Sequence, residues 1–141
     1  MRSPVDQVTE SLAGLALFAD LSHPELERIA HTLEERFFAQ DERVLREGIS
    51  GSAFYIILEG EATVTAGGHR LNVLGRGEFF GEISILLGQA PVADVVASRP
   101  MRCLVLPAQG LQEFLLTNPR VCYRMLMSEA RKLANATRRG G

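Results

Sequence analysis

The sequence predicts a mainly β protein, a jelly roll or small barrel, with helices flanking it at both ends of the chain. Between residues 34 and 106, short runs rich in β-branched and aromatic residues follow one another at close, even spacing, separated by glycine-rich and polar turns. Before and after this region, apolar residues recur at helical spacing. No strand–helix–strand alternation is visible in the sequence, so a parallel α/β sheet is not expected.

Length and composition narrow the class of protein. The 141 residues suit one domain with helical appendages, which we divide into an N-terminal helical segment (1–33), a β region (34–106) and C-terminal helices (107–141). With 46% hydrophobic residues and a net charge of -2, the chain resembles soluble globular proteins and has no overall attraction for nucleic acid or anionic membranes. Neither an apolar run of ~20 residues nor a signal-peptide pattern is present, so we expect a cytoplasmic protein that does not enter a membrane.

Two helices are predicted in the N-terminal segment. Apolar residues between Val5 and Phe18 recur on one helical face. Ser22 and Glu25 have the spacing of a capping box, with Pro24 in the first turn, and they open a second helix. The apolar face of this second helix comprises Leu26, Ile29, Ala30 and Leu33.

The β region contains a series of runs with the composition of short strands. Turn residues separate these runs, and the pair Gly67-Gly68 is typical of a hairpin tip. The predicted strands span residues 36–38, 44–46, 54–58, 62–65, 71–74, 79–80, 92–97 and 101–106.

Two more helices are predicted after the β region. The first begins at Pro107, and the second runs from Pro119 to about Thr137 with Asn118 as its N-cap. The second helix has an apolar face wide enough to contact the β region and another helix at once, which predicts a homodimer seam; packing of one face within a monomer is the alternative. That seam comprises Cys122, Leu126, Ala130, Leu133 and Thr137. The basic residues of this helix are expected to offset its dipole rather than to bind nucleic acid.

The most informative stretch runs from Phe79 to Val96. An aromatic pair leads into Gly81 and Glu82, and the apolar turn from Ile83 to Leu87 directs free backbone N–H groups and the positive end of a short helix at one point. This arrangement is typical of a seat for an anion, beside a carboxylate that accepts a hydrogen bond from a sugar hydroxyl. The alternative is an ordinary connection between a strand and a helix.

The residues predict neither an enzyme nor a metal site. Cys103 and Cys122 lie in different predicted elements and are expected to be small buried apolar residues rather than a disulfide or metal ligands. A metal-dependent cupin needs clustered histidines and carboxylates, whereas His23 and His31 fall in a helix and His69 falls on a hairpin tip. No nucleophile and base have a spacing that justifies catalysis.

Several separated motifs, in the same order, resemble the cyclic-nucleotide-binding domain family. They are Leu17-Phe18-Ala19-Asp20-Leu21-Ser22, Leu45-Arg46-Glu47-Gly48, Tyr55-Ile56-Ile57-Leu58-Glu59-Gly60-Glu61, Gly77-Glu78-Phe79-Phe80-Gly81-Glu82 and Thr117-Asn118-Pro119. The resemblance extends from about Leu12 to Thr137 and is nearest to the sensor domain of cyclic-AMP receptor protein and FNR-like regulators. It implies an eight-stranded antiparallel jelly roll, also called a double-stranded β-helix, with N-terminal and C-terminal helices. The chain ends at Gly141, without the helix-turn-helix domain of those regulators, so DNA binding is not expected.

Within this resemblance, residues 79–96 are similar to the family's phosphate-binding cassette. The implied ligand is cAMP or cGMP, as a regulatory ligand rather than a tightly bound cofactor. Glu82 then takes the ribose 2′-hydroxyl, and Gly81 and the Ile83 amide line the sugar-phosphate. The remaining residues of the implied site are Phe80, Ser84, Val92, Ala93, Asp94 and, near the base, Thr137.

One position departs from the family pattern. The family has an arginine ten residues after the glutamate, where it pairs with the cyclic phosphate, and this chain has Val92 there. Arginine suits phosphate because its planar fork donates two parallel charged hydrogen bonds. Its loss weakens binding by roughly tenfold to a hundredfold. Asp94 shares the face of Val92 in a regular strand, so its carboxylate is expected to repel a phosphate.

Two functions are compatible with these residues. The first is a regulatory sensor of cAMP or cGMP with weak binding, which acts by ligand-driven repacking of the helices at 107–137 and signals through a homodimer or an effector protein. The second is an interaction or dimerisation module of the same fold that has lost nucleotide binding or accepts another ligand. Titration with cAMP and cGMP separates the two.

Overall fold

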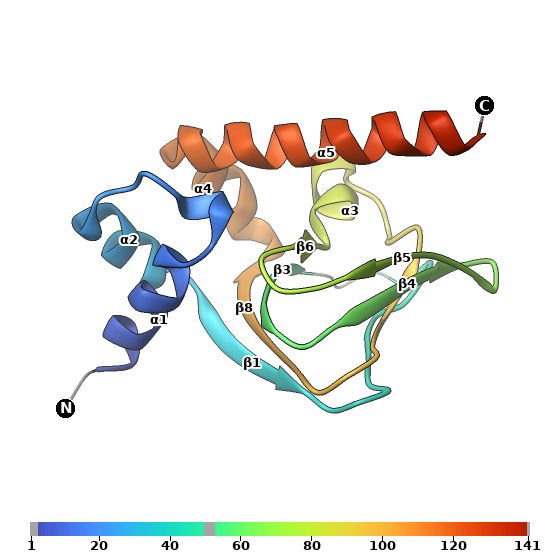
Figure 1. Cartoon of the computed structure of the whole chain (residues 1–141), viewed down its shortest axis with the longest axis horizontal. Helices are drawn as coiled ribbons and strands as arrows, with labels where there is room; N and C mark the ends of the chain where they lie inside the picture. The colour runs from blue at the N-terminus through green and yellow to red at the C-terminus, as the bar shows by residue number, and fades with distance from the viewer. Residues whose placement is uncertain (1–2, 50–52, 141) are drawn as a thin grey trace.

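The chain folds into two antiparallel sheets with helices at both ends. In a computed structural model, which describes residues 3–49 and 53–140, eight strands form two four-stranded sheets and every strand pair in these ranges is antiparallel (Figure 1). The first sheet has the order β1-β8-β3-β6 and the second β2-β7-β4-β5. The prediction of short antiparallel strands between helical ends is therefore confirmed, and the strands are arranged as a sandwich.

The strands lie close to their predicted positions. Their bounds are β1 Glu34–Phe38, β2 Arg43–Leu45, β3 Ala53–Glu59, β4 Ala62–Ala66, β5 His69–Leu74, β6 Phe79–Phe80, β7 Asp94–Ala97 and β8 Met101–Pro107. Three strands begin two residues from the predicted position: β1 and β5 begin earlier, and β7 begins later, at Asp94 rather than at residue 92. Residues before it belong to a loop, because the Pro91 carbonyl accepts a hydrogen bond from the Gly48 N–H at 2.9 Å and not from a neighbouring strand.

The helices also differ from their predicted extents. Their bounds are α1 Pro4–Ala13, α2 His23–Ala30, α3 Glu82–Leu87, α4 Leu111–Thr117 and α5 Pro119–Gly140, with 3-10 turns η1 at Ala16–Phe18 and η2 at Ala108–Gly110. The predicted helix from residue 5 to 18 is interrupted after Ala13, where Gly14 is the C-cap. The helix expected from Pro107 begins at Leu111, because Pro107 is still the last residue of β8.

Local hydrogen bonds fix several of these boundaries. The capping box before α2 is confirmed: the Ser22 N–H donates to Glu25 Oε1 at 2.9 Å and the Glu25 N–H donates to Ser22 Oγ at 3.3 Å. At the α4–α5 junction, Asn118 precedes α5 as predicted, and its carbonyl accepts from the Cys122 N–H at 3.0 Å, but its side chain does not cap α5. Its side-chain amide donates to the Phe114 carbonyl at 2.9 Å and so satisfies the end of α4.

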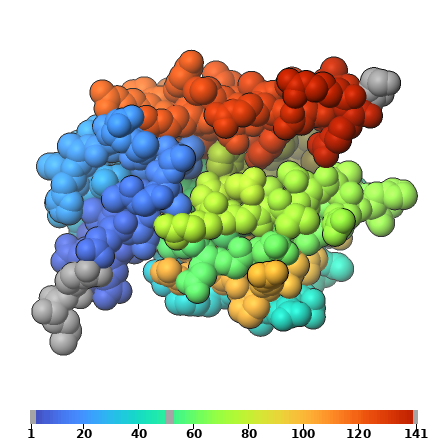
Figure 2. Space-filling view, in the orientation of Figure 1, coloured from blue at the N-terminus to red at the C-terminus, as the bar shows by residue number. Residues whose placement is uncertain are grey.

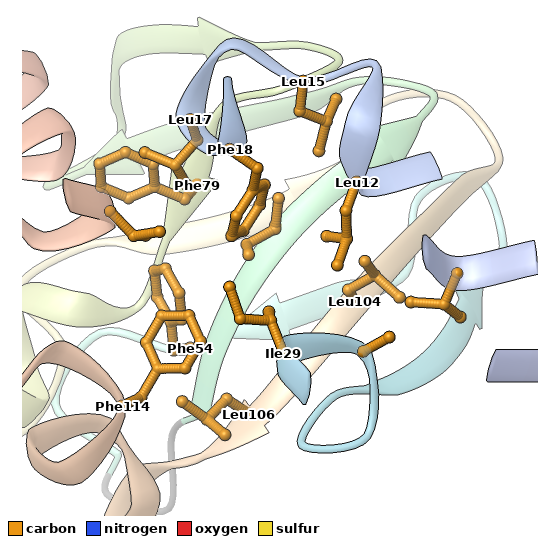
Figure 3. Packing of buried hydrophobic residues seen from close by; sticks show 14 of the residues in the cluster. Leu12, Leu15, Leu17, Phe18, Ile29, Phe54, Phe79, Leu104, Leu106 and Phe114 are labelled. Carbon is orange, nitrogen blue, oxygen red and sulfur yellow. The ribbon is translucent and has the colours of Figure 1, made fainter. Parts of the chain in front are cut away.

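The β3–β8 pair is buried on both faces and separates two hydrophobic clusters. Phe54, Ile56 and Leu58 of β3 face the N-terminal and C-terminal helices and belong to the helix-side cluster. Tyr55 and Ile57 face the interior of the sandwich and belong to the second cluster. This division follows from the alternation of side chains along a strand. Figure 3 shows Phe54 in the first cluster, among side chains from η1, α2, β6, β8 and α4.

The helix α5 runs across the molecule and is fixed at its N-terminal half. Val121 and Met125 are buried in the helix-side cluster. Arg120 donates to the Asp20 carbonyl at 3.0 Å, and Arg124 donates to the Ala19 carbonyl and to the Asp20 carboxylate. These contacts join α5 to the N-terminal segment, and from there α5 passes over α3 (Figure 1).

Candidate ligand-binding site

The cassette-like stretch, residues 79–96, begins with a close approach of backbone to backbone. Gly81 has φ 94° and is the N-cap of α3. A Cβ on Gly81 would lie 2.1 Å from the Ala53 carbonyl oxygen of β3, so no larger residue fits. Gly88 ends α3 with φ 65° and has open space around it. The segment that Gly81 approaches this closely is β3.

A cavity of about 180 Å³ lies between this stretch, the second sheet and α5. Most of its lining is apolar. Seven of the predicted site residues line it: Phe80, Gly81, Glu82, Ile83, Ser84, Val92 and Ala93. The lining residues that the site prediction did not include are Leu45, Val64, Asn72, Leu74, Phe79, Pro91, Val95 and Lys132.

Two predicted residues are outside the lining. The Asp94 carboxylate accepts a hydrogen bond from the Glu47 N–H at 2.7 Å and thereby ties the cassette to the turn after β2. Thr137 lies near the end of α5, where its exposed hydroxyl donates to the Leu133 carbonyl at 2.9 Å. The structure therefore brings seven of the nine predicted residues together, and the other two have partners elsewhere.

The cassette side of the cavity carries no positive charge. Val92 is at the rim with 55% of its surface exposed. Among the residues in the described ranges, no arginine lines the cavity, and Lys132 is its single cation. An anion at Val92 would therefore meet backbone amides but no guanidinium.

Glu82 is the most perturbed group of the site. Only 3% of its surface is exposed. Burial and a hydrogen bond with the Glu129 carboxyl of α5 raise the pKa of Glu82 from 4.5 to about 8, while Lys132 acts in the opposite direction. Burial therefore favours the protonated form of Glu82, and its hydrogen bond with Glu129 links the cassette to α5.

The α5 side of the site was missed by the sequence prediction. Lys132 Nζ lies 4.6 Å from the centroid of the Phe79 ring and 3.3 Å from Glu129 Oε1. Glu129 and Lys132 are three residues apart and so share a helix face, one turn beyond the buried Met125. The spacing in the sequence indicates that Glu129 and Lys132 share a helix face. Only the fold shows that this face lies over the cassette.

Metal and thiol chemistry find little support in the described part of the chain. Within residues 3–49 and 53–140, no group of three histidine, cysteine or carboxylate side chains gathers as metal ligands would. Cys103 and Cys122 are free; Cys103 is fully buried, as predicted, and Cys122 is half-buried. Burial raises the pKa of the Cys103 thiol to about 12, so it is unreactive at neutral pH.

None of the helices described has the length and apolar character to cross a bilayer.

A family comparison decides the class of this domain. The family model described as cyclic nucleotide-binding domain matches residues 35–118, which is more than half of the chain. The chain belongs to the cyclic nucleotide-binding domain family. The matched range includes both sheets and the cassette, and it ends at Asn118, just before α5.

The chain is similar to parts of several larger proteins, among them cGMP-dependent protein kinases, regulatory subunits of cAMP-dependent protein kinases and an activator protein. A cAMP-dependent protein kinase regulatory subunit of Mycosarcoma maydis is 40% identical over 91 residues, which is 62% of this chain and 17% of the subunit. Catabolite activator protein of Thermus thermophilus matches with TM-score 0.75 and 27% identity, over 86% of this chain and 59% of that one. The regulatory subunit of a cAMP-independent protein kinase A from Trypanosoma brucei matches with TM-score 0.79 and 25% identity, over 90% and 46%. The chain spans 12% to 25% of the length of the curated relatives it matches.

The backbone contact at Gly81 predicts a large difference between the two glycines of α3. We expect Gly81→Ala to lower the free energy of unfolding by about 3 kcal/mol, because the new methyl group meets the Ala53 carbonyl and φ is positive. Gly88→Ala has the same backbone cost without the clash, so about 1 kcal/mol is expected. Urea unfolding of both variants measures this, and equal losses would contradict the argument.

The raised pKa of Glu82 predicts that stability falls as pH rises. The folded state binds the proton of Glu82 more tightly than the unfolded state, so this contribution is fully present below pH 4.5 and is lost as pH rises toward about 8. We expect the unmodified chain to lose up to about 1.4 kcal/mol per pH unit more than Glu82→Gln between pH 5 and pH 8. Urea unfolding at both pH values tests this, with the exposed Glu113→Gln as control. Parallel pH profiles for the unmodified chain and Glu82→Gln would refute it.

Proposed function

We propose that this chain is a regulatory ligand-binding domain whose cyclic-nucleotide cavity is retained in shape but binds cAMP or cGMP weakly. One observation carries the proposal: the cassette forms a cavity with Glu82 in its wall and Val92, rather than a cation, at its rim. The family and its regulatory relatives support a regulatory rather than a catalytic role.

Weak binding follows from the charges around the cassette. A cyclic phosphate beside Val92 keeps the N–H groups of α3 as donors but lacks a charged donor, which costs roughly tenfold to a hundredfold in affinity. Asp94 is engaged with the Glu47 N–H, so its negative charge stays near the cassette. Glu82 is occupied by Glu129 and must release it to accept from a ribose hydroxyl.

The contacts of α5 suggest how ligand binding is transmitted. Glu129 and Lys132 lie against Glu82 and Phe79, so a ligand that engages Glu82 competes with α5 for the same groups. A ligand shifts the equilibrium between two arrangements of α5 only to the extent that it binds them with different affinities. We propose that ligand binding repacks α4 and α5 against the cassette, and that an effector protein reads the change.

The second candidate function is a domain of the same fold with another ligand or none. The specific observation in its favour is the uncharged rim at Val92 together with an apolar lining. The T. brucei regulatory subunit, at 25% identity, is described as part of a cAMP-independent kinase, which shows that the fold also occurs without that dependence.

A homodimer is the assembly we propose for either function. Leu126, Ala130 and Leu133 of the predicted seam are exposed on α5. With the exposed Tyr123 in place of the half-buried Cys122, they follow the four-and-three spacing of a coiled-coil seam. The same stripe on a second copy is self-complementary about a two-fold axis. The buried Val121 and Met125 use the opposite side of the helix, so the stripe stays available.

Calorimetric titration with cAMP and cGMP tests the proposed function. We expect weak binding, and Val92→Arg should tighten it by roughly tenfold to a hundredfold because it restores a charged donor. The double variant with Asp94→Asn removes the nearby negative charge while it keeps the acceptor for Glu47, and should bind at least as tightly.

Matched substitutions separate a site effect from a general charge effect. Leu87→Arg adds the same charge to exposed α3 surface outside the cavity and should leave affinity unchanged. Glu82→Ala should weaken the binding gained by Val92→Arg. A dissociation constant below about 1 μM for the unmodified chain would contradict weak binding. An unchanged affinity in Val92→Arg would place any nucleotide site elsewhere.

Sedimentation velocity at tens of micromolar tests the dimer. We expect the unmodified chain to sediment as a dimer and Leu126→Glu to shift it toward monomer, since two facing glutamates repel across the seam. Leu116→Glu, on α4 and 74% exposed, is the matched control and should not change the sedimentation coefficient. A monomeric unmodified chain would rule out the seam.

A further inference from the structure

We propose that the cavity accepts a compact organic anion. The apolar body of this ligand lies against the cassette, and its acidic group lies between β5 and α5, beside Lys132. The inference rests on the proposed ligand-binding function of the same cavity and names the chemical class of its ligand. It follows from the apolar lining, the size of the cavity and the position of its cation.

The size and lining of the cavity favour a small apolar body. Its volume is about 180 Å³, and Leu45, Val64, Leu74, Phe80 and Val95 are among its walls. A comparable cavity of roughly 150 Å³ lined by Leu, Ile and Phe binds benzene. Pockets for drug-sized ligands are roughly 300 Å³ or more, so the volume of this cavity suits a single aromatic ring better than a drug-sized ligand.

Positive charge is concentrated where α5 passes the edge strand β5. A second hollow of about 510 Å³ there shares Asn72 and Lys132 with the cavity, and its other lining residues are Leu71, Asn135, Arg138 and Arg139. Figure 2 shows the C-terminal part of α5 lying above the β5 side of the sandwich. Lys132, Arg138 and Arg139 therefore lie at the β5 end of the cavity, and none of them lies beside Val92.

The position of Lys132 on α5 is not explained by compensation of the helix dipole alone. Arg138 and Arg139 are in the last turn of α5, where basic residues are expected for that reason. Lys132 is about two turns earlier and lies over the Phe79 ring, with 36% of its side chain exposed. This partial burial strengthens its attraction for an anion.

The acidic groups nearby allow an anion to enter. Burial and the neighbouring Glu129 carboxyl favour the protonated form of Glu82, which lessens its repulsion of an anion. Glu129 already pairs with Lys132 at 3.3 Å, and an incoming carboxylate competes with it. Removal of the Glu129 charge should therefore strengthen ligand binding, whereas removal of the Lys132 charge should weaken it.

Calorimetric titration of the full chain at pH 7 compares an acid with its uncharged analogue. The probes are 3-phenylpropanoate and 3-phenylpropan-1-ol, which share the ring and the linker, and cAMP and cGMP are titrated in parallel. We expect the acid to bind at least tenfold more tightly than the alcohol, which is the contribution of one charged hydrogen bond. This preference should fall as salt rises.

Three single substitutions on one helix test the position of the charge. Lys132→Gln should weaken binding of the acid about tenfold, and Glu129→Gln should tighten it severalfold. Arg131→Gln removes the same charge from the next residue, which is exposed and lines neither hollow, so affinity should be unchanged. Thermal unfolding checks that each variant is folded. If Lys132→Gln does not fold, the inference is tested by the ratio of the affinities for acid and alcohol and by the affinity of Glu129→Gln for the acid.

The outcomes distinguish this inference from the proposed function. Equal affinity for acid and alcohol, or equal losses in Lys132→Gln and Arg131→Gln, would overturn the inference while the cavity stays a ligand site. Binding of cAMP or cGMP without binding of the acid would also overturn it and leave the proposed function intact. Absence of binding by the acid and by both nucleotides would overturn both. Binding of the acid with the expected pattern of variants supports it, whatever the nucleotides do.

Discussion

The pairing of β3 with β8 is the interaction on which the rest of the structure depends. Both strands are buried on both faces, so one face builds the helix-side cluster and the other builds the interior of the sandwich. β6 pairs with β3, and its two residues divide in the same way: Phe79 joins the helices and Phe80 joins the sandwich. The cassette follows directly from this point, so its position is set by the central strands.

The site combines a tightly constrained backbone with a cation on only one side. Gly81 opens α3 at a positive φ, and its close approach to the Ala53 carbonyl of β3 leaves no room for a larger residue. The charged contact to the ligand cavity comes instead from Lys132 on α5. The same helix joins the N-terminal segment through Arg120 and Arg124, so α5 contacts both the cavity and the N-terminal segment.

Local patterns predicted the secondary structure well, and the errors have physical causes. The capping box at Ser22 and the hairpin at Gly67-Gly68 are fixed by neighbouring residues, and both are found where expected. The helix boundaries near Ala13 and Leu111 were misplaced because apolar spacing continues through a 3-10 turn as readily as through an α-helix. Asn118 directly precedes α5 as predicted, but its side-chain amide donates to the preceding helix instead of accepting from the following one, and an amide can do either.

The sequence by itself determined the family, and it predicts a cassette with the uncharged Val92 in it, because both are expressed in the type and spacing of neighbouring residues. Only the tertiary structure decided what those residues contact. Glu82 meets Glu129, and Asp94 meets Glu47 rather than the cavity, and in both pairs the partners are far apart in the sequence. Such contacts depend on how the sheets and α5 pack together, which no local pattern specifies.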